Sequence, residues 1–254
     1  MTDRIARAAL VTGAARRIGR AIALALHHAG YAVAIQANRS VADADALRDD
    51  IVRAGGCAAV VRADLADHVA VARLVSTAAA AIGPLTVLVN NAAMFEPDAV
   101  GALDAERFDQ QFAVNLRAPL FLAEAFAAQA RAGANASVVN ILDQRVFKLT
   151  PHFVSYTLAK SALHAATRIL AQALAPNVRV NAVAPGPTIA SARQQQQDFA
   201  RQVAAVPLGH GPGVDEIADA VIYLASARSV TGATLVVDGG QHLAWQTPDA
   251  GVAE

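Results

Sequence analysis

The sequence predicts an α/β fold in which a doubly wound parallel sheet is flanked by helices on both faces. Short apolar runs alternate with longer helical patterns along the chain, which is typical of parallel strands joined by helical crossovers. The composition, 55% hydrophobic residues over 254 positions, is enough for one large core. Because no linker or repeat divides the chain, we expect one domain over residues 1–254, with a ligand crevice at the carboxyl ends of the strands.

Four apolar runs with strand character occupy the first half of the chain, and a helical pattern follows each of them. The helix after the first run has Ile18, Ile22 and Leu26 at helical spacing, and Gly30 ends it. The expected strands are 8–12, 31–37, 57–63 and 85–91, and the expected helices are 16–30, 41–55, 67–81 and 104–131.

The second half continues the same alternation. Strands are expected at 137–142, 178–185 and 234–240, and helices at 154–174 and 214–225. A lid segment is expected at about 188–212, because Phe199, Val203 and Val206 fall on one helical face there. An ordinary surface helix explains the same spacing equally well.

Charge and composition exclude several function classes. Lys+Arg and Asp+Glu number 21 each, and no basic tract favours a nucleic acid as partner. Charges and helix breakers interrupt every apolar run, so no membrane span is expected. The single cysteine, Cys57, and the lack of a leader pattern favour a cytoplasmic location, and the histidine spacing predicts no metal site.

The loop VTGAARRIGRAIA joins the first strand to the first helix. A helix N-terminus offers unpaired N–H groups and a positive dipole, which suit a pyrophosphate. Gly13 and Gly19 permit a close backbone approach, whereas Arg17 stands where the middle glycine of such loops is usual. Taken alone, the stretch also fits an ordinary strand–helix turn.

The end of the second strand predicts which nicotinamide cofactor would bind. An NAD site commonly places an acid there for the ribose hydroxyls, but residues 36–40 contain no Asp or Glu. Asn38, Arg39 and Ser40 offer donors instead, and Arg16 adds a second cation. Donors and cations suit a 2′-phosphate, so the sequence predicts NADPH, although a solvated loop arginine is the simpler alternative.

Two further segments lie where an adenosine would bind. Asp64 and Leu65 follow the third strand, and Asp64 is equally suited to reaching the adenine or to capping the next helix. The small residues at 90–93 close the fourth strand and let the backbone pass beside a ribose.

Tyr156 and Lys160 are four residues apart on a helical stretch and therefore share one face. A free tyrosine has a pKa of about 10. A neighbouring ammonium stabilises the phenolate, so we expect Lys160 to lower the pKa of Tyr156 and make it a proton donor. Asn115 precedes Pro119 by four residues, so its carbonyl is expected to lose its helical partner and hold a relay water.

These motifs together resemble the short-chain dehydrogenase/reductase family over nearly the whole chain. The resemblance rests on Thr12-Gly13, Asp64, Asn90-Asn91-Ala92, Asn115, Tyr156 with Lys160, Pro185-Gly186 and VDGG at 237–240. It implies a Rossmann-type fold with seven parallel strands, a nicotinamide cofactor and commonly a homotetramer. It also assigns Pro185, Gly186 and Thr188 to the nicotinamide end. The cofactor-binding residues expected from the motifs and the resemblance together are Gly13, Arg16, Arg17, Ile18, Gly19, Asn38, Arg39, Ser40, Asp64, Leu65, Asn91, Ala92, Ala93, Tyr156, Lys160, Pro185, Gly186 and Thr188.

Four departures from the usual pattern of that family resemble its pteridine reductase and dihydromonapterin reductase branch: Arg17 in place of the middle glycine, Asn38-Arg39-Ser40 after the second strand, Phe95 after residues 90–94, and Asp143 in place of a serine. The resemblance implies that Arg17 reaches towards the cofactor phosphate and the pterin, that Phe95 stacks the pterin, and that Asp143 works with Tyr156. Ala93 and Met94 supply no hydroxyl beside the pterin. A carboxylate would oppose the negative charge of a reacting carbonyl oxygen, whereas reduction of a C=N bond needs a proton on nitrogen.

The predicted function is therefore NADPH-dependent reduction of a C=N bond in a dihydropterin-like small molecule, with Asp143, Tyr156, Lys160 and Asn115 as catalytic residues. Asp143 is alternatively a structural acid that caps a loop or pairs with Arg145. A second hypothesis is a carbonyl or alcohol oxidoreductase acting on a 3-oxoacyl compound or a cyclic ketone. A third is a non-catalytic NADPH-binding regulator, although Asn115, Tyr156 and Lys160 are all present.

Overall fold

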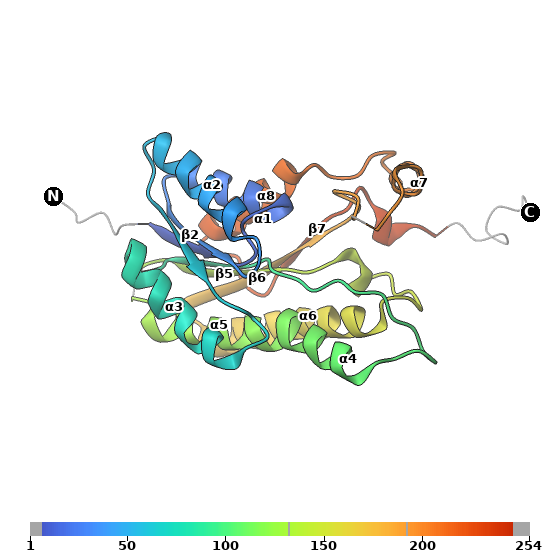
Figure 1. The fold of residues 1–254 in the computed structure, drawn as a ribbon, viewed down its shortest axis with the longest axis horizontal. Helices are drawn as coiled ribbons and strands as arrows, with labels where there is room; N and C mark the ends of the chain where they lie inside the picture. The colour runs from blue at the N-terminus through green and yellow to red at the C-terminus, as the bar shows by residue number, and fades with distance from the viewer. Residues whose placement is uncertain (1–6, 132, 192, 246–254) are drawn as a thin grey trace, which may run out of the picture.

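The protein is described by a computed structural model that covers residues 7–131, 133–191 and 193–245. Its centre is one seven-stranded sheet in the order β3-β2-β1-β4-β5-β6-β7, and every neighbouring pair of strands is parallel (Figure 1). The strands are β1 Ala8–Val11, β2 Ala32–Ala37, β3 Ala58–Arg62, β4 Val87–Asn90, β5 Ala136–Ile141, β6 Val178–Pro185 and β7 Thr234–Val237. The expected doubly wound parallel sheet is confirmed, with its switch point between β1 and β4.

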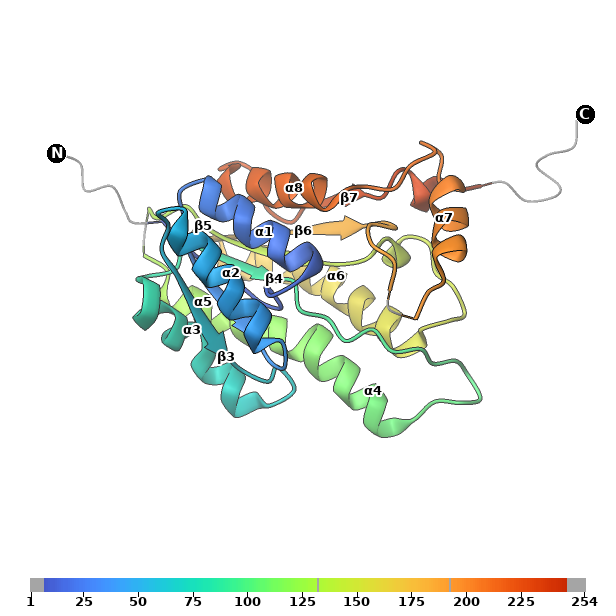
Figure 2. The same cartoon turned by 45° about the horizontal axis from the view of Figure 1, so that its top comes forward.

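Helices cover both faces of the sheet. In Figure 1, α1, α2 and α8 lie on one face, and α3, α4, α5 and α6 lie on the other. Figure 2 shows α7 standing apart from both layers, beyond the end of β6. The helices are α1 Arg17–His28, α2 Val41–Arg53, α3 His68–Ile82, α4 Ala105–Phe112, α5 Ala118–Gln129, α6 Val154–Leu174, α7 Gln196–Ala204 and α8 Val214–Ser226.

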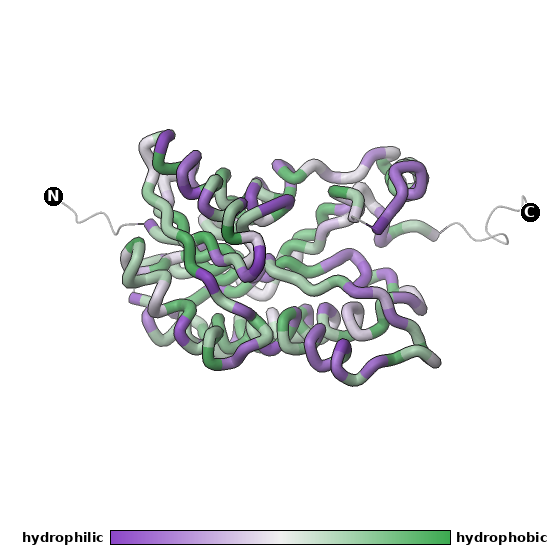
Figure 3. Tube along the Cα trace, in the orientation of Figure 1, coloured by the Kyte–Doolittle hydropathy of each residue, from purple (hydrophilic) through white to green (hydrophobic). Residues whose placement is uncertain are grey.

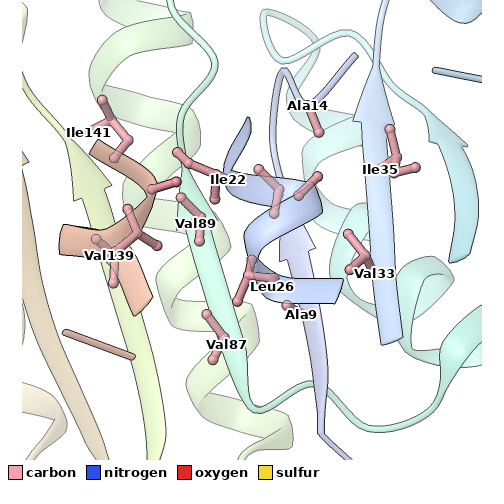
Figure 4. Packing of buried hydrophobic residues seen from close by; sticks show 14 of the residues in the cluster. Ala9, Ala14, Ile22, Leu26, Val33, Ile35, Val87, Val89, Val139 and Ile141 are labelled. Atoms are coloured by element: carbon pink, nitrogen blue, oxygen red, sulfur yellow. The ribbon is translucent and has the colours of Figure 1, made fainter. Parts of the chain in front are cut away.

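Side chains of each strand alternate between two apolar layers. Ala9 and Val11 of β1 belong to the layer under α1, α2 and α8, whereas Leu10 belongs to the opposite layer. Figure 4 shows Ile22 and Leu26 of α1 packed over the strands of the first layer. Burial of each such side chain stabilises the fold by roughly 1.5–3 kcal/mol, so the sheet is a rigid support for the loops at its carboxyl edge.

The single helix expected over 104–131 is divided into three segments. A π-helical turn, Ala113–Arg117, separates α4 from α5. The N–H of Ala118 donates to the carbonyl of Ala113, five residues back, instead of four. Because Pro119 has no N–H to offer, the helix accommodates one extra residue here, and Asn115 lies in this turn.

The segment expected as a lid contains one short helix, α7. No side chain of α7 is fully buried. Figure 3 shows α7 largely in the colours of hydrophilic residues, in contrast to the strands. Val206, just beyond α7, is buried. Within the described ranges, no helix has the length and apolar character needed to cross a membrane.

Candidate active site

Three adjoining cavities follow the carboxyl edge of the sheet. The first, here called the inner cavity, has a volume of about 500 Å³ and is bordered by Asp143, Phe95 and the lid segment. The other two, here called the outer crevice, measure about 650 and 670 Å³ and are bordered by the glycine loop and the ends of β2 and β3. Arg17 and Phe95 line both the inner cavity and the outer crevice, so the cavities form one continuous site.

Most of the expected site residues lie in these cavities. Asn115, Lys160 and Pro185 do not line them and are buried behind the wall. The expected residues that line them are Gly13, Arg16, Arg17, Ile18, Gly19, Asn38, Arg39, Ser40, Asp64, Leu65, Asn91, Ala92, Ala93, Phe95, Asp143, Tyr156, Gly186 and Thr188.

The glycine loop is held by the protein itself. The N–H of Gly13 donates to the side-chain oxygen of Gln36 at 2.8 Å, and the Gln36 amide nitrogen donates to the carbonyl of Ala63 at 2.8 Å. A Cβ on Gly19 would lie 2.3 Å from the Gly13 carbonyl oxygen. Gly19 therefore allows the loop to pack closely on α1. The sequence did not indicate that the side chain of Gln36 holds the loop through Gly13.

Arg17 takes the conformation that a glycine would take. Its φ is +56°, in the left-handed region that costs an ordinary residue roughly 1–2 kcal/mol. Its guanidinium donates to the carbonyls of Ile189 and Ala190, both at 2.9 Å. The side chain therefore ties the glycine loop to the lid segment, a contact across more than 170 positions that no local pattern indicated.

The cations of the outer crevice differ in their partners. The Nε of Arg16 lies 3.6 Å from the carboxylate of Asp43 in α2, and both side chains are exposed. Arg39 is also exposed, lines the crevice and forms no ion pair within the part of the chain that the structure describes. The positive charge at Arg39 is therefore available to an anion.

Asp64 does not cap the following helix. The residue that precedes α3 is Asp67, and its carboxylate accepts a hydrogen bond from the N–H of Val69 at 2.8 Å. Asp64 instead accepts one from the N–H of Ala66 at 2.9 Å and lines the outer crevice. The helix-cap alternative is wrong, because the helix begins three residues later than a cap at Asp64 requires.

Helix α6 carries Tyr156, and Asp98 fixes where that helix begins. The backbone carbonyl of Asp98 accepts from the N–H of Phe153 at 2.9 Å, and its carboxylate accepts from the N–H of Ser155 at 3.2 Å. Phe153 has a φ of +57°, also in the left-handed region. These contacts orient the first turn of α6, and Tyr156 lies in that turn.

The hydroxyl of Tyr156 donates to Oδ2 of Asp143 at 3.0 Å. The other carboxylate oxygen, Oδ1, accepts from the backbone N–H of Arg145 at 2.9 Å. Asp143 therefore caps the short 3₁₀ helix Gln144–Val146 and contacts Tyr156 at the same time. The two interpretations of this acid, as a loop cap and as a partner of the tyrosine, are both realised.

Burial dominates the electrostatics of the pair. It raises the pKa of the Asp143 carboxyl above its usual value. Burial and the neighbouring Asp143 carboxylate raise the pKa of Tyr156 well above 10. The carboxyl group of Asp143 therefore stays protonated to a higher pH than the carboxyl group of an exposed aspartate.

The pKa of Tyr156 is raised instead of lowered, and the Lys160 ammonium does not contact its hydroxyl, contrary to the sequence expectation. Its Nζ donates to the carbonyl of Ile141 at 2.6 Å and lies 5.8 Å from the centre of the Tyr156 ring. The Asp143 carboxylate, not the ammonium, is the group at the hydroxyl. Burial also lowers the pKa of Lys160 to about 8.

Asn115 fixes the loop after β4. Its side-chain nitrogen donates to the carbonyl of Met94 at 2.8 Å, and its side-chain oxygen accepts from the N–H of Met94 at 3.0 Å. The side chain is fully buried. This pairing positions the next residue, Phe95, whereas the water relay through the Asn115 carbonyl stays a prediction.

Phe95 belongs to an aromatic group that the sequence did not reveal. Its ring is stacked on Phe153 with centroids 4.2 Å apart, and it meets Tyr156 edge-on at 4.7 Å. The guanidinium of Arg145 lies 5.1 Å from the centre of the Phe153 ring. One face of Phe95 is therefore covered by protein.

The lid segment is anchored at a second point. Arg193 forms an ion pair with Glu96 at 2.9 Å and donates to the carbonyl of Phe95. Together with the contacts of Arg17, these two contacts of Arg193 hold the lid segment over the inner cavity.

Over the described ranges, no cluster of three or more His, Cys, Asp or Glu residues could hold a metal ion.

Comparisons with known proteins agree with this geometry. Residues 13–242 match the family model described as enoyl-(acyl carrier protein) reductase. Pteridine reductase 1 of Leishmania tarentolae is 35% identical over 288 residues, covering 95% of this chain and 98% of that protein. L-xylulose reductase of Bos taurus is 37% identical over 243 residues, covering 92% and 96%.

Two solved structures are similar throughout. FolM alternative dihydrofolate reductase 1 from Brucella suis, in complex with NADP, is 51% identical with a TM-score of 0.93 and covers 96% of this chain and 98% of that chain. A blue fluorescent protein from a metagenomic library, in complex with NADPH, is 32% identical with a TM-score of 0.85 and covers 92% and 97%.

The strain at Arg17 can be measured with two matched variants. Arg17→Gly and Arg17→Ala both remove the contacts to the lid segment, but only glycine is unstrained at this φ. We expect the unfolding free energy of Arg17→Gly to exceed that of Arg17→Ala by about 1 kcal/mol, as measured by denaturant titration. Equal stabilities would show that the left-handed conformation carries no strain.

The buried ammonium of Lys160 should make stability depend on pH. Its pKa is about 8 in the folded protein and 10.5 in an exposed chain, so between these values the unfolded state binds more protons. The unfolding free energy should therefore rise with pH over that window. Lys160→Met should remove this rise and be more stable than the unmodified protein at pH values below 8. Identical pH dependence in both proteins would contradict the burial of a charged lysine.

Proposed function

We propose a reaction from one premise: the chain belongs to the short-chain dehydrogenase/reductase family and is an oxidoreductase. The proposed reaction is the reduction of a C=N bond in a dihydropterin-like ring, with NADPH as the hydride donor. The pair of Tyr156 and Asp143 supplies the proton. The observation that carries this proposal is the hydrogen bond of 3.0 Å between Tyr156, which is buried, and Asp143, which is half-buried at the edge of the inner cavity.

A carboxyl group beside the tyrosine hydroxyl selects the type of bond that is reduced. A reacting carbonyl gathers negative charge on oxygen, which an adjacent carboxylate destabilises. A reacting C=N bond needs a proton on nitrogen, and a neutral carboxyl group can provide it. Burial raises the pKa of Asp143, which keeps that proton available at higher pH than in an exposed aspartate.

The outer crevice fits an NADP(H) molecule. Arg39 offers a cation that forms no ion pair with the residues the structure describes, and Asn38 and Ser40 add donors beside it, as a 2′-phosphate requires. The glycine loop and the start of α1 would hold the pyrophosphate, and Asp64 would face the adenine. The cofactor supplies the hydride when it is bound, and the protein's own groups orient the substrate and move the proton.

The proton transfer involves two groups of the chain. The proton on the Tyr156 hydroxyl or on the Asp143 carboxyl passes to the substrate nitrogen, and their hydrogen bond lets one restore the other. Lys160, held by the Ile141 carbonyl behind the cavity wall, keeps a positive charge near the pair. Arg17 and Phe95 border the inner cavity, where the substrate ring would lie.

The similar proteins support a pterin substrate by name. The Leishmania tarentolae relative is a pteridine reductase, and the Brucella suis structure is an alternative dihydrofolate reductase. Reduction of a carbonyl compound is the second candidate, because the Bos taurus relative is an L-xylulose reductase. The loss of NADPH absorbance with 7,8-dihydropterins, compared with a panel of ketones and 3-oxoacyl compounds, separates the two. Turnover of ketones alone would overturn the first proposal.

We also propose a homotetramer in the cytoplasm. Exposed apolar side chains on α5 and α6 support self-association, since Phe121 is 55%, Leu158 50% and Ile169 62% exposed. Light scattering after gel filtration would give the mass in solution.

The preference for NADPH should depend on Arg39. A charge-assisted hydrogen bond contributes roughly 1.5–3 kcal/mol, so Arg39→Ala should lower the ratio of kcat/KM for NADPH to that for NADH by at least about tenfold. Arg53→Ala is the control, because Arg53 is an exposed arginine that pairs with Asp50 and does not line the crevice. Equal kcat/KM for the two cofactors in the unmodified enzyme would refute the proposed phosphate site.

Asp143 should distinguish the two kinds of substrate. Asp143→Ala should lose roughly 10²–10⁴-fold in kcat on a C=N substrate, the scale of a positioned acid. Asp143→Ser should lose the same activity while any weak ketone reduction rises. In the unmodified enzyme, kcat should fall as pH rises through the raised pKa of Asp143, because the acid form is the active one. A parallel loss on both substrate types, with a lower Tm, would leave Asp143 as a loop cap.

A further inference from the structure

A short turn after β3 forms part of the wall of the outer crevice and is closed by its own hydrogen bonds. The carboxylate of Asp64 accepts from the N–H of Ala66 at 2.9 Å, and the carbonyl of Asp64 accepts from the N–H of Asp67 at 3.1 Å. This turn of residues 64–67, here called the β3 turn, brings Asp64, Leu65 and Ala66 to the crevice. The shape of the wall therefore depends on what holds the β3 turn in place.

The π-helical turn between α4 and α5 reaches the β3 turn through Arg117. The guanidinium of Arg117 donates to the carbonyl of Ala66 at 2.6 Å, across 51 positions of sequence. This carbonyl and the N–H of Asp67 belong to one peptide group, so a cation at one end polarises the group and strengthens the hydrogen bond at the other. Arg117 therefore anchors the β3 turn and supports its internal closure.

The same π-helical turn contributes a side chain to the crevice. Val114, three residues before Arg117, lines the outer crevice together with the β3 turn. Its neighbour Asn115 holds the loop after β4 at Met94, and that loop borders the crevice as well. The bond of Arg117 thus fixes the β3 turn relative to Val114, and with it the space between these two parts of the lining.

Arg117 acts on the crevice without lining it. It does not border either cavity of the outer crevice, and its side chain is exposed. A hydrogen bond at the surface adds little to the stability of the whole fold. It can still favour binding, because a loop that is already held in place loses less conformational entropy when a ligand arrives.

The arginines that line the outer crevice have a different task. Arg16 and Arg39 border the part where the 2′-phosphate would bind. Arg117 instead holds the backbone beside Asp64, which would face the adenine. NADPH and NADH share the adenine and differ in the 2′-phosphate, so a contribution of Arg117 should be equal for the two cofactors.

We propose that Arg117 is a positioning residue for the adenosine half of NADP(H). It holds the β3 turn, and through it Asp64 and Leu65, in place before the cofactor binds. This inference rests on the proposed placing of the adenosine in the outer crevice.

Calorimetric titration with adenosine 2′,5′-bisphosphate, NADPH and NADH tests this role, because the first of these ligands carries the adenosine half alone. Arg117→Met removes the N–H donors and keeps an unbranched side chain. It should weaken the binding of all three ligands by the same factor, about three- to tenfold, the scale of one hydrogen bond. Because only cofactor binding is lost, kcat at saturating NADPH should change by less than about twofold.

Amide hydrogen exchange in the ligand-free protein is a second measurement, and it does not depend on turnover. The N–H groups of Ala66 and Asp67 should exchange faster in Arg117→Met than in the unmodified protein, because the β3 turn has lost its anchor. The Tm should stay within about 2 °C of the unmodified value, since a surface bond contributes little to the global fold.

Arg107→Met is the matched control. Arg107 is also exposed and donates to a loop carbonyl, that of Pro97 at 3.3 Å, but it does not line the outer crevice. This variant should keep the Kd of all three ligands within about twofold of the unmodified values.

The inference fails if Arg117→Met binds adenosine 2′,5′-bisphosphate as tightly as the unmodified protein does, or if Arg107→Met weakens its binding equally. A joint loss of kcat and Tm in Arg117→Met would also overturn it, because the residue would then be structural. If the unmodified protein does not bind adenosine 2′,5′-bisphosphate, the proposed cofactor site fails first, and the two failures are thereby distinguished.

Discussion

The hydrogen bond between the Tyr156 hydroxyl and the Asp143 carboxylate is the contact around which the site is arranged. Asp143 follows β5, Tyr156 lies in the first turn of α6, and the parallel sheet brings these two elements to the same edge. Asp98 sets the start of α6, and Asn115 fixes the loop that carries Phe95. Desolvation at this edge raises the pKa of both partners.

The site keeps several features that oppose stability. A buried ammonium at Lys160 and left-handed backbone at Arg17 and Phe153 each cost free energy. The rigid core under the sheet offsets these costs. Strain and buried charge at one edge of an otherwise regular α/β fold are typical of a functional site. In this chain the strained residues are those that hold the lid segment and the aromatic ring next to Tyr156.

The sequence predicted the sheet, its helices and most of the crevice, because apolar runs and helical spacing report burial directly. Strand β6 and helix α6 have the expected bounds for this reason. The sequence did not predict the contacts that long side chains make across the fold, such as those of Arg17 with the lid segment or of Gln36 with Gly13. It also gave the wrong direction for the pKa of Tyr156, because sequence spacing shows that a lysine is near but not which group lies at the hydroxyl.

The protonation state of Asp143 decides whether this carboxyl group can be the proton donor. The ¹³Cγ chemical shift of aspartate, followed by NMR over a pH titration and assigned by comparison with Asp143→Asn, reports that state in the protein with NADP⁺ bound. We expect the Asp143 carboxyl to remain protonated above the usual aspartate pKa of about 3.9, and Tyr156→Phe to change the midpoint of its titration. An ordinary midpoint near that value, unaffected by Tyr156→Phe, would contradict the proposed proton donor.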